Sequence, residues 1–134
     1  MTDTMTAKAY RRKHVPTEHA EQAQLFEVAA IRAERDGRWG MLYAIPNGGD
    51  RHPAVGAALK AEGVKAGVPD VHLPVPVGRH HGLYIELKRT VGGRVEQAQA
   101  EWIEDLQAQG YRVEVCRGCD AAVAAITEYL GRLV

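Results

Sequence analysis

The stretch Ile85-Glu86-Leu87-Lys88 follows Gly67-Val68-Pro69-Asp70, with fifteen residues between Asp70 and Glu86. Side chains at positions i and i+2 of a strand point to the same face, so Glu86 and Lys88 should stand side by side. Leu87 should then face the opposite way, into the core. If Asp70 lies on an adjacent strand, its carboxylate can join the other two charges. We therefore expect two carboxylates and one ammonium at a single point of a sheet.

Two carboxylates beside a lysine are the groups needed for metal-dependent phosphodiester cleavage. This chemistry requires a cation that neutralises charge on the phosphate, a deprotonated water and often an ammonium. Mg²⁺ prefers oxygen ligands and keeps several waters, so Asp70, Glu86 and one backbone carbonyl, such as that of Leu87, would suffice. A Glu-x-Lys pattern alone is ordinarily a cross-paired surface strand. The order of the surrounding elements must decide between the two explanations.

The overall composition predicts a small globular protein. The chain has 134 residues, 46% of them hydrophobic, and a formal net charge of zero. This fits one domain with an ordinary core, and it argues against a protein that coats nucleic acid by bulk charge. No apolar run approaches the roughly 20 residues of a membrane span, and the N-terminus lacks a signal-peptide core. We therefore expect a soluble, cytoplasmic protein without membrane contact.

The two cysteines, Cys116 and Cys119, form a single Cys-x-x-Cys. A zinc ribbon usually needs two such pairs, and a redox pair usually opens a helix after the first strand of a thioredoxin-like unit. His72, His80 and His81 could in principle complete a zinc site. Two ordinary thiols, at a strand end and a helix start, are the favoured interpretation.

The pattern of apolar residues predicts a mixed α/β layer structure behind a flexible basic arm at residues 1–15. The expected elements are a helix from its N-cap Thr17 to about Asp36, a strand over 40–45, a short helix over 53–62, strands over 70–77 and 83–88, a helix over 95–109, a strand over 111–116 and a final helix capped by Asp120. Pro74 and Pro76 suggest that the far end of the 70–77 strand lies at a sheet edge.

Helical phase selects among neighbouring polar residues. In the first helix, Glu18 and Gln22 fall in line with the apolar positions Leu25 and Ala29. In the 95–109 helix, Gln99 falls on the apolar side, whereas Gln97 points away from it. Gln99 is therefore expected to face the sheet.

The full pattern resembles the PD-(D/E)XK nuclease superfamily and, within it, the small stand-alone VRR-NUC proteins of phages and bacteria. The resemblance covers about residues 17–131 and makes 16–134 a single nuclease domain. It rests on these features in order: Glu18 to Gln22, Asn47-Gly48-Gly49, Gly63 through Gly67-Val68-Pro69-Asp70, Ile85-Glu86-Leu87-Lys88, Gln99 and Gly110-Tyr111. It implies a restriction-endonuclease-like α/β core, with a central mixed β-sheet flanked by helices.

The resemblance also implies roles for individual residues. Asp70 and Glu86 would bind Mg²⁺ or Mn²⁺, which accept the same oxygen ligands, and Lys88 would be the catalytic lysine. An acid of the first helix commonly assists the metal through water. Glu18 matches the family's spacing to a glutamine best, and Glu21 remains possible because it lies near the same helical face.

The glutamine that follows the Glu-x-Lys strand in the family matches Gln99, in agreement with its helical phase. A glutamine at the edge of the core, hydrogen-bonded to backbone, is the structural alternative. Residue type alone makes Asn47, Arg51, Lys65 and Arg89 weak candidates for contact with DNA. Trp39, Tyr43 and the 46–52 loop could contact a partner or DNA, or could equally serve ordinary packing.

The small members of this family act on branched DNA such as Holliday junctions or flaps, often as homodimers, so the resemblance implies the same here, in a bacterial or phage-infected cell. A dimer would carry one site for each strand to be cut. The competing hypothesis is a nucleic-acid-binding module that keeps the nuclease fold without chemistry. The complete set of two acids and a lysine argues against that hypothesis.

Overall fold

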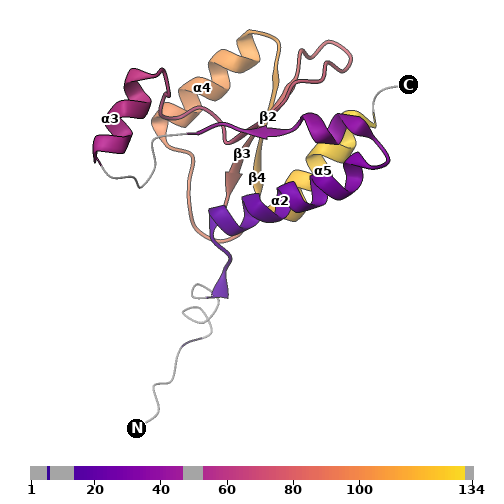
Figure 1. The fold of residues 1–134 in the computed structure, drawn as a ribbon, viewed down its shortest axis with the longest axis horizontal. Coiled ribbons are helices and arrows are strands. Elements are labelled where there is room, and N and C mark those ends of the chain that lie inside the picture. Colours follow the sequence, from indigo (N-terminus) through magenta and orange to yellow (C-terminus); the bar gives the residue numbers. More distant parts are fainter. Residues whose placement is uncertain (1–5, 7–13, 47–52, 132–134) are drawn as a thin grey trace.

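The computed structural model describes residues 6, 14–46 and 53–131, so the predicted arm lies largely outside the described residues. The elements in chain order are α2 (Glu18–Ala33), the 3₁₀ helix η1 (Gly37–Met41), β1 (Tyr43–Ala44), α3 (Pro53–Ala61), β2 (Val71–Leu73), β3 (Leu83–Lys88), α4 (Gln97–Ala108), β4 (Arg112–Arg117) and α5 (Cys119–Leu130). The strands form one sheet in the order β1-β2-β3-β4. Neighbouring strands are antiparallel except β3 and β4, which are parallel. The predicted mixed sheet flanked by helices is confirmed (Figure 1).

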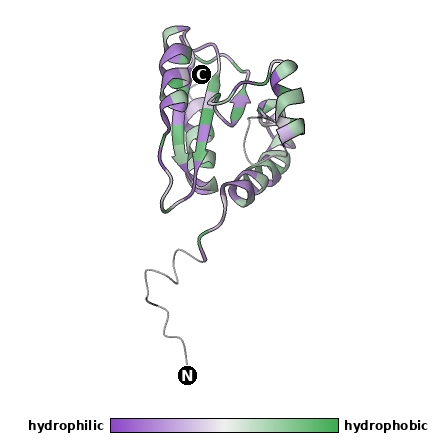
Figure 2. Ribbon diagram, turned by 90° about the vertical axis from the view of Figure 1, so that its left-hand side faces the viewer, coloured by the Kyte–Doolittle hydropathy of each residue, from purple (hydrophilic) through white to green (hydrophobic). Residues whose placement is uncertain are grey.

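The core lies between the sheet and the helices α2 and α5. Strand β3 contributes Leu83, Ile85 and Leu87, all buried, and the helices contribute residues such as Leu25 and Ile126. Hydrophobic and hydrophilic residues follow one another along the strands in Figure 2, as expected for a sheet with one apolar face. Helix α4 packs against β4 from the other face and connects the parallel pair β3 and β4.

The segment before β2 lies tightly against α4. Gly67 has a φ of +91°, and a Cβ added there would lie 2.8 Å from the carbonyl carbon of Ala98 in α4. Only glycine combines this backbone conformation with so close an approach. Gly67 therefore brings the chain that leads to Asp70 directly beside the start of α4.

The strand predicted over 70–77 is wrong in its length and position. Strand β2 ends at Leu73 and pairs on both sides, with β1 and β3, so it lies inside the sheet. Pro74 and Pro76 have no N–H to donate to a ladder, which ends the strand. Val75 and Val77 stay buried beyond it, and for this reason the apolar alternation continued past the true end.

The strand predicted over 40–45 shrinks to Tyr43–Ala44, because Gly37–Met41 form a 3₁₀ helix. The Asp36 side chain caps this short helix by accepting a hydrogen bond from Arg38 N at 3.1 Å. The first long helix consequently ends at Ala33, before the expected Asp36. Its predicted N-cap is confirmed, since Thr17 Oγ1 accepts from Ala20 N at 3.0 Å.

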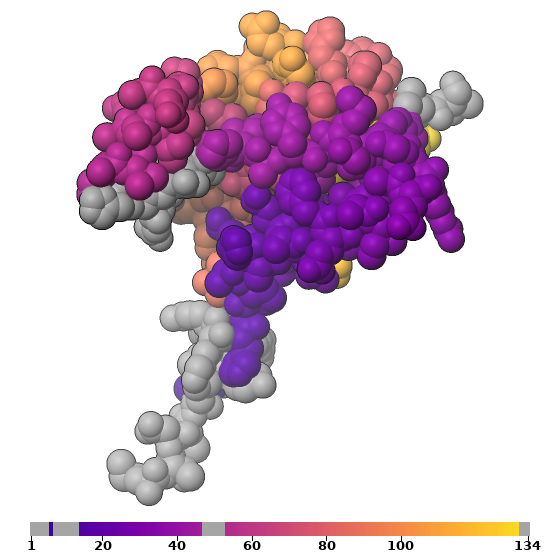
Figure 3. All heavy atoms as spheres, viewed as in Figure 1, coloured from indigo at the N-terminus to yellow at the C-terminus, as the bar shows by residue number. Residues whose placement is uncertain are grey.

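The predicted cap of the last helix is also wrong. Helix α5 begins at Cys119 after Gly118, and Asp120 lies in its first turn. The first N–H of the helix is instead bonded by the Glu21 carboxylate of α2. Helix α3, predicted correctly over its length, has no buried residue and forms a lobe at the left of Figure 3.

Candidate active site

Strand β3 supplies two charged side chains to the face opposite the core. Lys88 Nζ lies 3.5 Å from Glu86 Oε1, and the two side chains are 6% and 2% exposed. Leu87, between them, points into the core and is 1% exposed. The alternation expected from the sequence is confirmed. Charged side chains buried this deeply are rare unless they are paired. Their burial here indicates a functional site rather than an ordinary charged surface.

Asp70 lies directly before β2, the antiparallel neighbour of β3. Because Val71 pairs with Ile85, the same register places Asp70 opposite Glu86. Asp70 Oδ2 accepts a hydrogen bond from Leu87 N at 2.7 Å. The Asp70 carboxylate thus accepts the hydrogen bond that a backbone carbonyl would accept if β2 were longer. This bond holds the carboxylate against β3.

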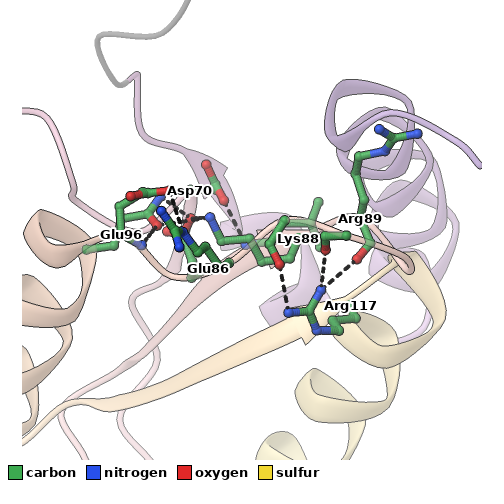
Figure 4. A network of polar contacts seen from close by, with 11 residues as sticks. Asp70, Glu86, Lys88, Arg89, Glu96 and Arg117 are labelled. Atoms are coloured by element: carbon green, nitrogen blue, oxygen red, sulfur yellow. Dashed lines mark hydrogen bonds and ion pairs between the residues drawn. The ribbon is translucent and has the colours of Figure 1, made fainter. Parts of the chain in front are cut away.

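Gln99 of α4 is hydrogen-bonded to both charged residues of β3, Glu86 and Lys88, which are labelled in Figure 4. Its Oε1 accepts from Lys88 Nζ at 2.9 Å, and its Nε2 donates to Glu86 Oε1 at 2.8 Å. The same Oε1 also accepts from Glu96 N at 2.8 Å, at the start of α4. Gln97 points elsewhere and bonds Glu101. The helix start therefore fixes the amide of Gln99 between Glu86 and Lys88, on the side that helical phase predicted.

The Glu86 carboxylate is held in an environment that disfavours its charge. Burial, followed by repulsion from Asp70, raises the pKa of Glu86 to about 8, although the ammonium of Lys88 acts in the opposite direction. Among the described residues, Glu86 Oε2 is buried and finds no hydrogen-bond donor. Two adjacent carboxylates with an unsatisfied buried oxygen fit a hard divalent cation, which would offset their repulsion.

The backbone carbonyl of Leu87 offers a third oxygen beside Asp70 and Glu86. The Lys88 carbonyl accepts from Gly118 N at 2.9 Å, on the β4 side of the strand. Backbone carbonyls alternate in direction along a strand, so the Leu87 carbonyl points to the other side, toward Asp70. The oxygens that could hold a cation are therefore those of Asp70, Glu86 and the Leu87 carbonyl.

In the described ranges, no three His, Cys, Asp or Glu side chains gather as a metal site by themselves. A cation at this place would thus depend on two carboxylates, a backbone carbonyl and water, which is a common arrangement for Mg²⁺. Cys116 and Cys119 lie at a strand and at a helix start, as predicted, and both are buried free thiols. Burial raises the pKa of Cys116 to about 11, so this thiol is poorly suited to chemistry.

The two acids of α2 occupy different places. Glu21 is buried, and its carboxylate accepts a hydrogen bond from Cys119 N, which joins α2 to the start of α5. Glu18 is exposed, and a Cβ added to Gly93 would lie 3.8 Å from Glu18 Oε1 and 3.9 Å from Lys88 Cδ. Glu18 is therefore the acid of α2 whose carboxylate lies near Gly93, which the Lys88 side chain also approaches.

Arg117, which the sequence did not single out, holds the loop that follows Lys88 (Figure 4). Its Nη1 donates to the carbonyls of Arg89 and Gly92 at 3.2 and 2.7 Å, and its Nη2 donates to Gly93 at 3.0 Å. All three acceptors are backbone groups, so no residue pattern announces this contact. The loop thereby stays beside the site.

Arg89 was predicted to contact DNA, but its guanidinium is hydrogen-bonded to backbone carbonyls of this protein. It donates to the carbonyls of Val15 and Pro16 at 3.1 and 3.4 Å. These bonds hold the segment that leads into α2, and thus the approach to Glu18. The arrangement favours a positioning role for Arg89 over direct contact with phosphate.

Four further residues were predicted as possible contacts with DNA or a partner: Lys65, Asn47, Arg51 and Trp39. Lys65 is exposed in the loop between α3 and β2, whereas Asn47 and Arg51 lie outside the described residues. Trp39 is buried, with the Arg32 guanidinium 4.9 Å from its ring centroid, and therefore serves packing.

No helix in the described part of the chain is both long and apolar enough to cross a bilayer.

Comparison with known proteins agrees with this geometry. The model of the VRR-NUC domain family matches residues 18–120. A solved structure described as a VRR_NUC domain protein is 28% identical in sequence, with a TM-score of 0.73, over 87% of this chain and 90% of that chain. No curated protein matches the sequence. The matched residues include the whole network of Asp70, Glu86, Lys88 and Gln99, and also Glu18.

Proposed function

The chain belongs to the VRR-NUC domain family, which has a nuclease fold, and we propose that it is a divalent-metal-dependent DNA endonuclease that hydrolyses phosphodiester bonds. The observation that carries this proposal is the buried network in which Gln99 links Glu86 to Lys88, with Asp70 opposite. A domain that only binds DNA has no physical need to bury two carboxylates beside each other, because carboxylates repel phosphate.

Asp70, Glu86 and the Leu87 carbonyl are the groups that would hold Mg²⁺ or Mn²⁺. When bound there, such a cation would neutralise charge on the scissile phosphate and lower the pKa of a coordinated water. Glu18 would assist through water from the first helix, which its position near Lys88 supports.

Lys88 presents its ammonium to the reacting groups in one defined orientation. One of its three hydrogens is directed to Gln99 Oε1 at 2.9 Å, a second faces Glu86 Oε1 at 3.5 Å, and the third can reach the attacking water or a phosphate oxygen. A flipped Gln99 would bring its NH₂ against the ammonium and its oxygen against the Glu86 carboxylate. Because both contacts would be repulsive, the amide keeps Lys88 aimed at the site.

We further propose that the substrate is branched DNA, such as a Holliday junction or a flap, and that two copies act as a homodimer. This proposal follows from the resemblance to the small members of the family, which act on branched DNA, often as homodimers. A two-fold dimer would present one site to each of two strands.

Cleavage of labelled four-way junction, flap, single-stranded and linear duplex DNA tests the proposal. Wild type is compared with Lys88→Ala in Mg²⁺, in Mn²⁺ and in chelator. We expect metal-dependent cutting of branched DNA by wild type alone. Wild-type activity in Lys88→Ala would overturn the site, and equal cutting of linear duplex would remove the preference for branches. Binding without cutting in every metal condition would identify a non-catalytic module.

The homodimer is tested by light scattering of the protein bound to a junction. We expect the mass of two protein copies on each junction. The mass of a single copy under conditions of full cleavage would contradict the dimer and leave the nuclease in place.

A further inference from the structure

An aromatic row crosses the sheet on the same face as the site. Tyr43 of β1 pairs with His72 of β2, which in turn pairs with Tyr84 of β3. The His72 and Tyr84 rings are stacked, with centroids 4.1 Å apart and an interplanar angle of 7°. Tyr111 meets Tyr84 edge-on at 5.2 Å. These four rings are called the aromatic row below.

The aromatic row is continuous with the carboxylates. Tyr84 lies two residues before Glu86, and His72 lies two residues after Asp70, so strand alternation places the rings on the face that carries the acids. On this face, the ring of Tyr84 is next to the Glu86 carboxylate along β3. The ring of His72 in β2 is likewise next to the carboxylate of Asp70, which precedes β2. A nucleotide whose phosphate lies at the carboxylates would therefore have its neighbouring base within reach of the row.

Tyr43, at the open end of the row, is both exposed and fixed in place. It is 47% exposed, yet its hydroxyl is hydrogen-bonded to His72 Nδ1 at 2.7 Å and its ring meets the His72 ring edge-on at 5.3 Å. A surface tyrosine is usually free to change rotamer. Here the ring is held before any ligand arrives, which lowers the entropic cost of binding against it.

We propose that the aromatic row, through Tyr43, stacks with an unpaired nucleobase adjacent to the scissile phosphate. The proposal rests on the proposed nuclease function and narrows its substrate to DNA with an unpaired nucleotide beside the cut, such as a flap or a single-stranded end. Stacking on an aromatic side chain requires an exposed base face, which a paired base inside a duplex does not offer.

The test uses Lys88→Ala protein in chelator, so that DNA is bound without being cut. The probe is a single-stranded oligonucleotide with one 2-aminopurine, whose fluorescence is quenched when it stacks. We expect quenching by the Lys88→Ala protein. Adding Tyr43→Ala should abolish the quenching and weaken binding about ten-fold, whereas Tyr43→Phe, which keeps the ring, should stay within about two-fold.

Two controls separate stacking from other effects. Met41→Ala removes another exposed side chain close by, 49% exposed, and should change neither quenching nor affinity. Fully paired duplex should bind Lys88→Ala and Lys88→Ala/Tyr43→Ala equally. A Tyr43→Ala defect of the same size on duplex, or unchanged quenching in Tyr43→Ala, would overturn the proposal.

Abasic scanning tests the same proposal from the DNA side and does not depend on how the variant folds. A single abasic nucleotide is moved through the oligonucleotide, with Tyr43 intact. One position should weaken binding about ten-fold, and uniform binding at all positions would contradict stacking. Wild-type cleavage in Mg²⁺, measured separately, reports on the nuclease itself. Stacking without cleavage would overturn only the nuclease, and cleavage without stacking would overturn only the aromatic row.

Discussion

Successive side chains of β3 point to two different faces of the sheet, and the two faces affect the stability of the fold in opposite ways. Leu83, Ile85 and Leu87 are buried against α2 and α5, where each apolar side chain stabilises the fold by roughly 1.5–3 kcal/mol. Glu86 and Lys88 are buried as deeply, but taking their charges out of water opposes folding. One face of the strand therefore supplies the stability that allows the other face to keep two charged groups buried.

The largest expected effect comes from removing the charge of Lys88. Lys88→Ala should lower the rate of metal-dependent cleavage about a thousand-fold, because the site loses the group that faces the water and phosphate. Single-turnover cleavage under saturating protein measures the rate. Lys88→Met, which keeps most of the apolar stem, should lose as much activity. Cleavage by Lys88→Met at the wild-type rate would show that the charge is not needed.

The neighbouring substitution on the other face should have the opposite profile. Leu87→Ala should lower the free energy of unfolding by about 2–5 kcal/mol, since it leaves a cavity between the sheet and its helices. Urea denaturation followed by circular dichroism measures this loss. The molecules that remain folded at low temperature should still cleave. A smaller loss of stability in Leu87→Ala than in Lys88→Met would contradict the division of labour between the faces.

The parts of the structure that the sequence predicted well are those that depend on local periodicity. The alternation of Glu86, Leu87 and Lys88 follows from the two-residue repeat of a strand, and the choice of Gln99 over Gln97 follows from helical phase. Prediction was weaker where two local signals overlapped. The alternation of apolar residues continued through Val75, although the ladder of hydrogen bonds between strands had already ended before Pro74.

Contacts between distant parts of the chain could not be predicted in the same way. Glu21 bonds the start of α5 from 98 residues away, so nothing near Asp120 showed that the cap was already provided. Arg117 bonds backbone carbonyls in the loop after β3. The aromatic row exists only once the register aligns Tyr43, His72 and Tyr84. Each of these features depends on tertiary structure rather than on a motif.

Glu86→Gln should lower activity while raising stability. In chelator the variant should exceed wild type by about 2 kcal/mol at pH 9, because the amide removes a buried charge that Asp70 repels. The pKa of Glu86 is raised, so its favourable contribution is present below pH 4.5 and is lost as the pH rises through about 8.

The advantage of Glu86→Gln should therefore widen from pH 5 to pH 9. Urea denaturation of both proteins at pH 5, 7 and 9 measures the difference, in which the titrations that the two proteins share cancel. Metal-dependent cleavage by the variant should fall about a hundred-fold, because the carboxylate that would hold the cation is replaced by an amide. An advantage that is independent of pH, or one that narrows toward pH 9, would show that Glu86 is not held against its charge.

The smallest effect should come from Gln99, which would act on the cation and the phosphate through Glu86 and Lys88. Gln99→Ala should lower the cleavage rate about ten-fold, because Lys88 loses the acceptor that aims its ammonium and Glu86 loses a hydrogen-bond donor. Gln97→Ala, two residues away in the same helical turn, loses only an exposed contact with Glu101 and is the matched control. Its rate should stay within about two-fold of wild type. If Gln97→Ala were the more damaging substitution, α4 would have to present its other side to β3, and the link between the helix start and the two buried charges would be lost.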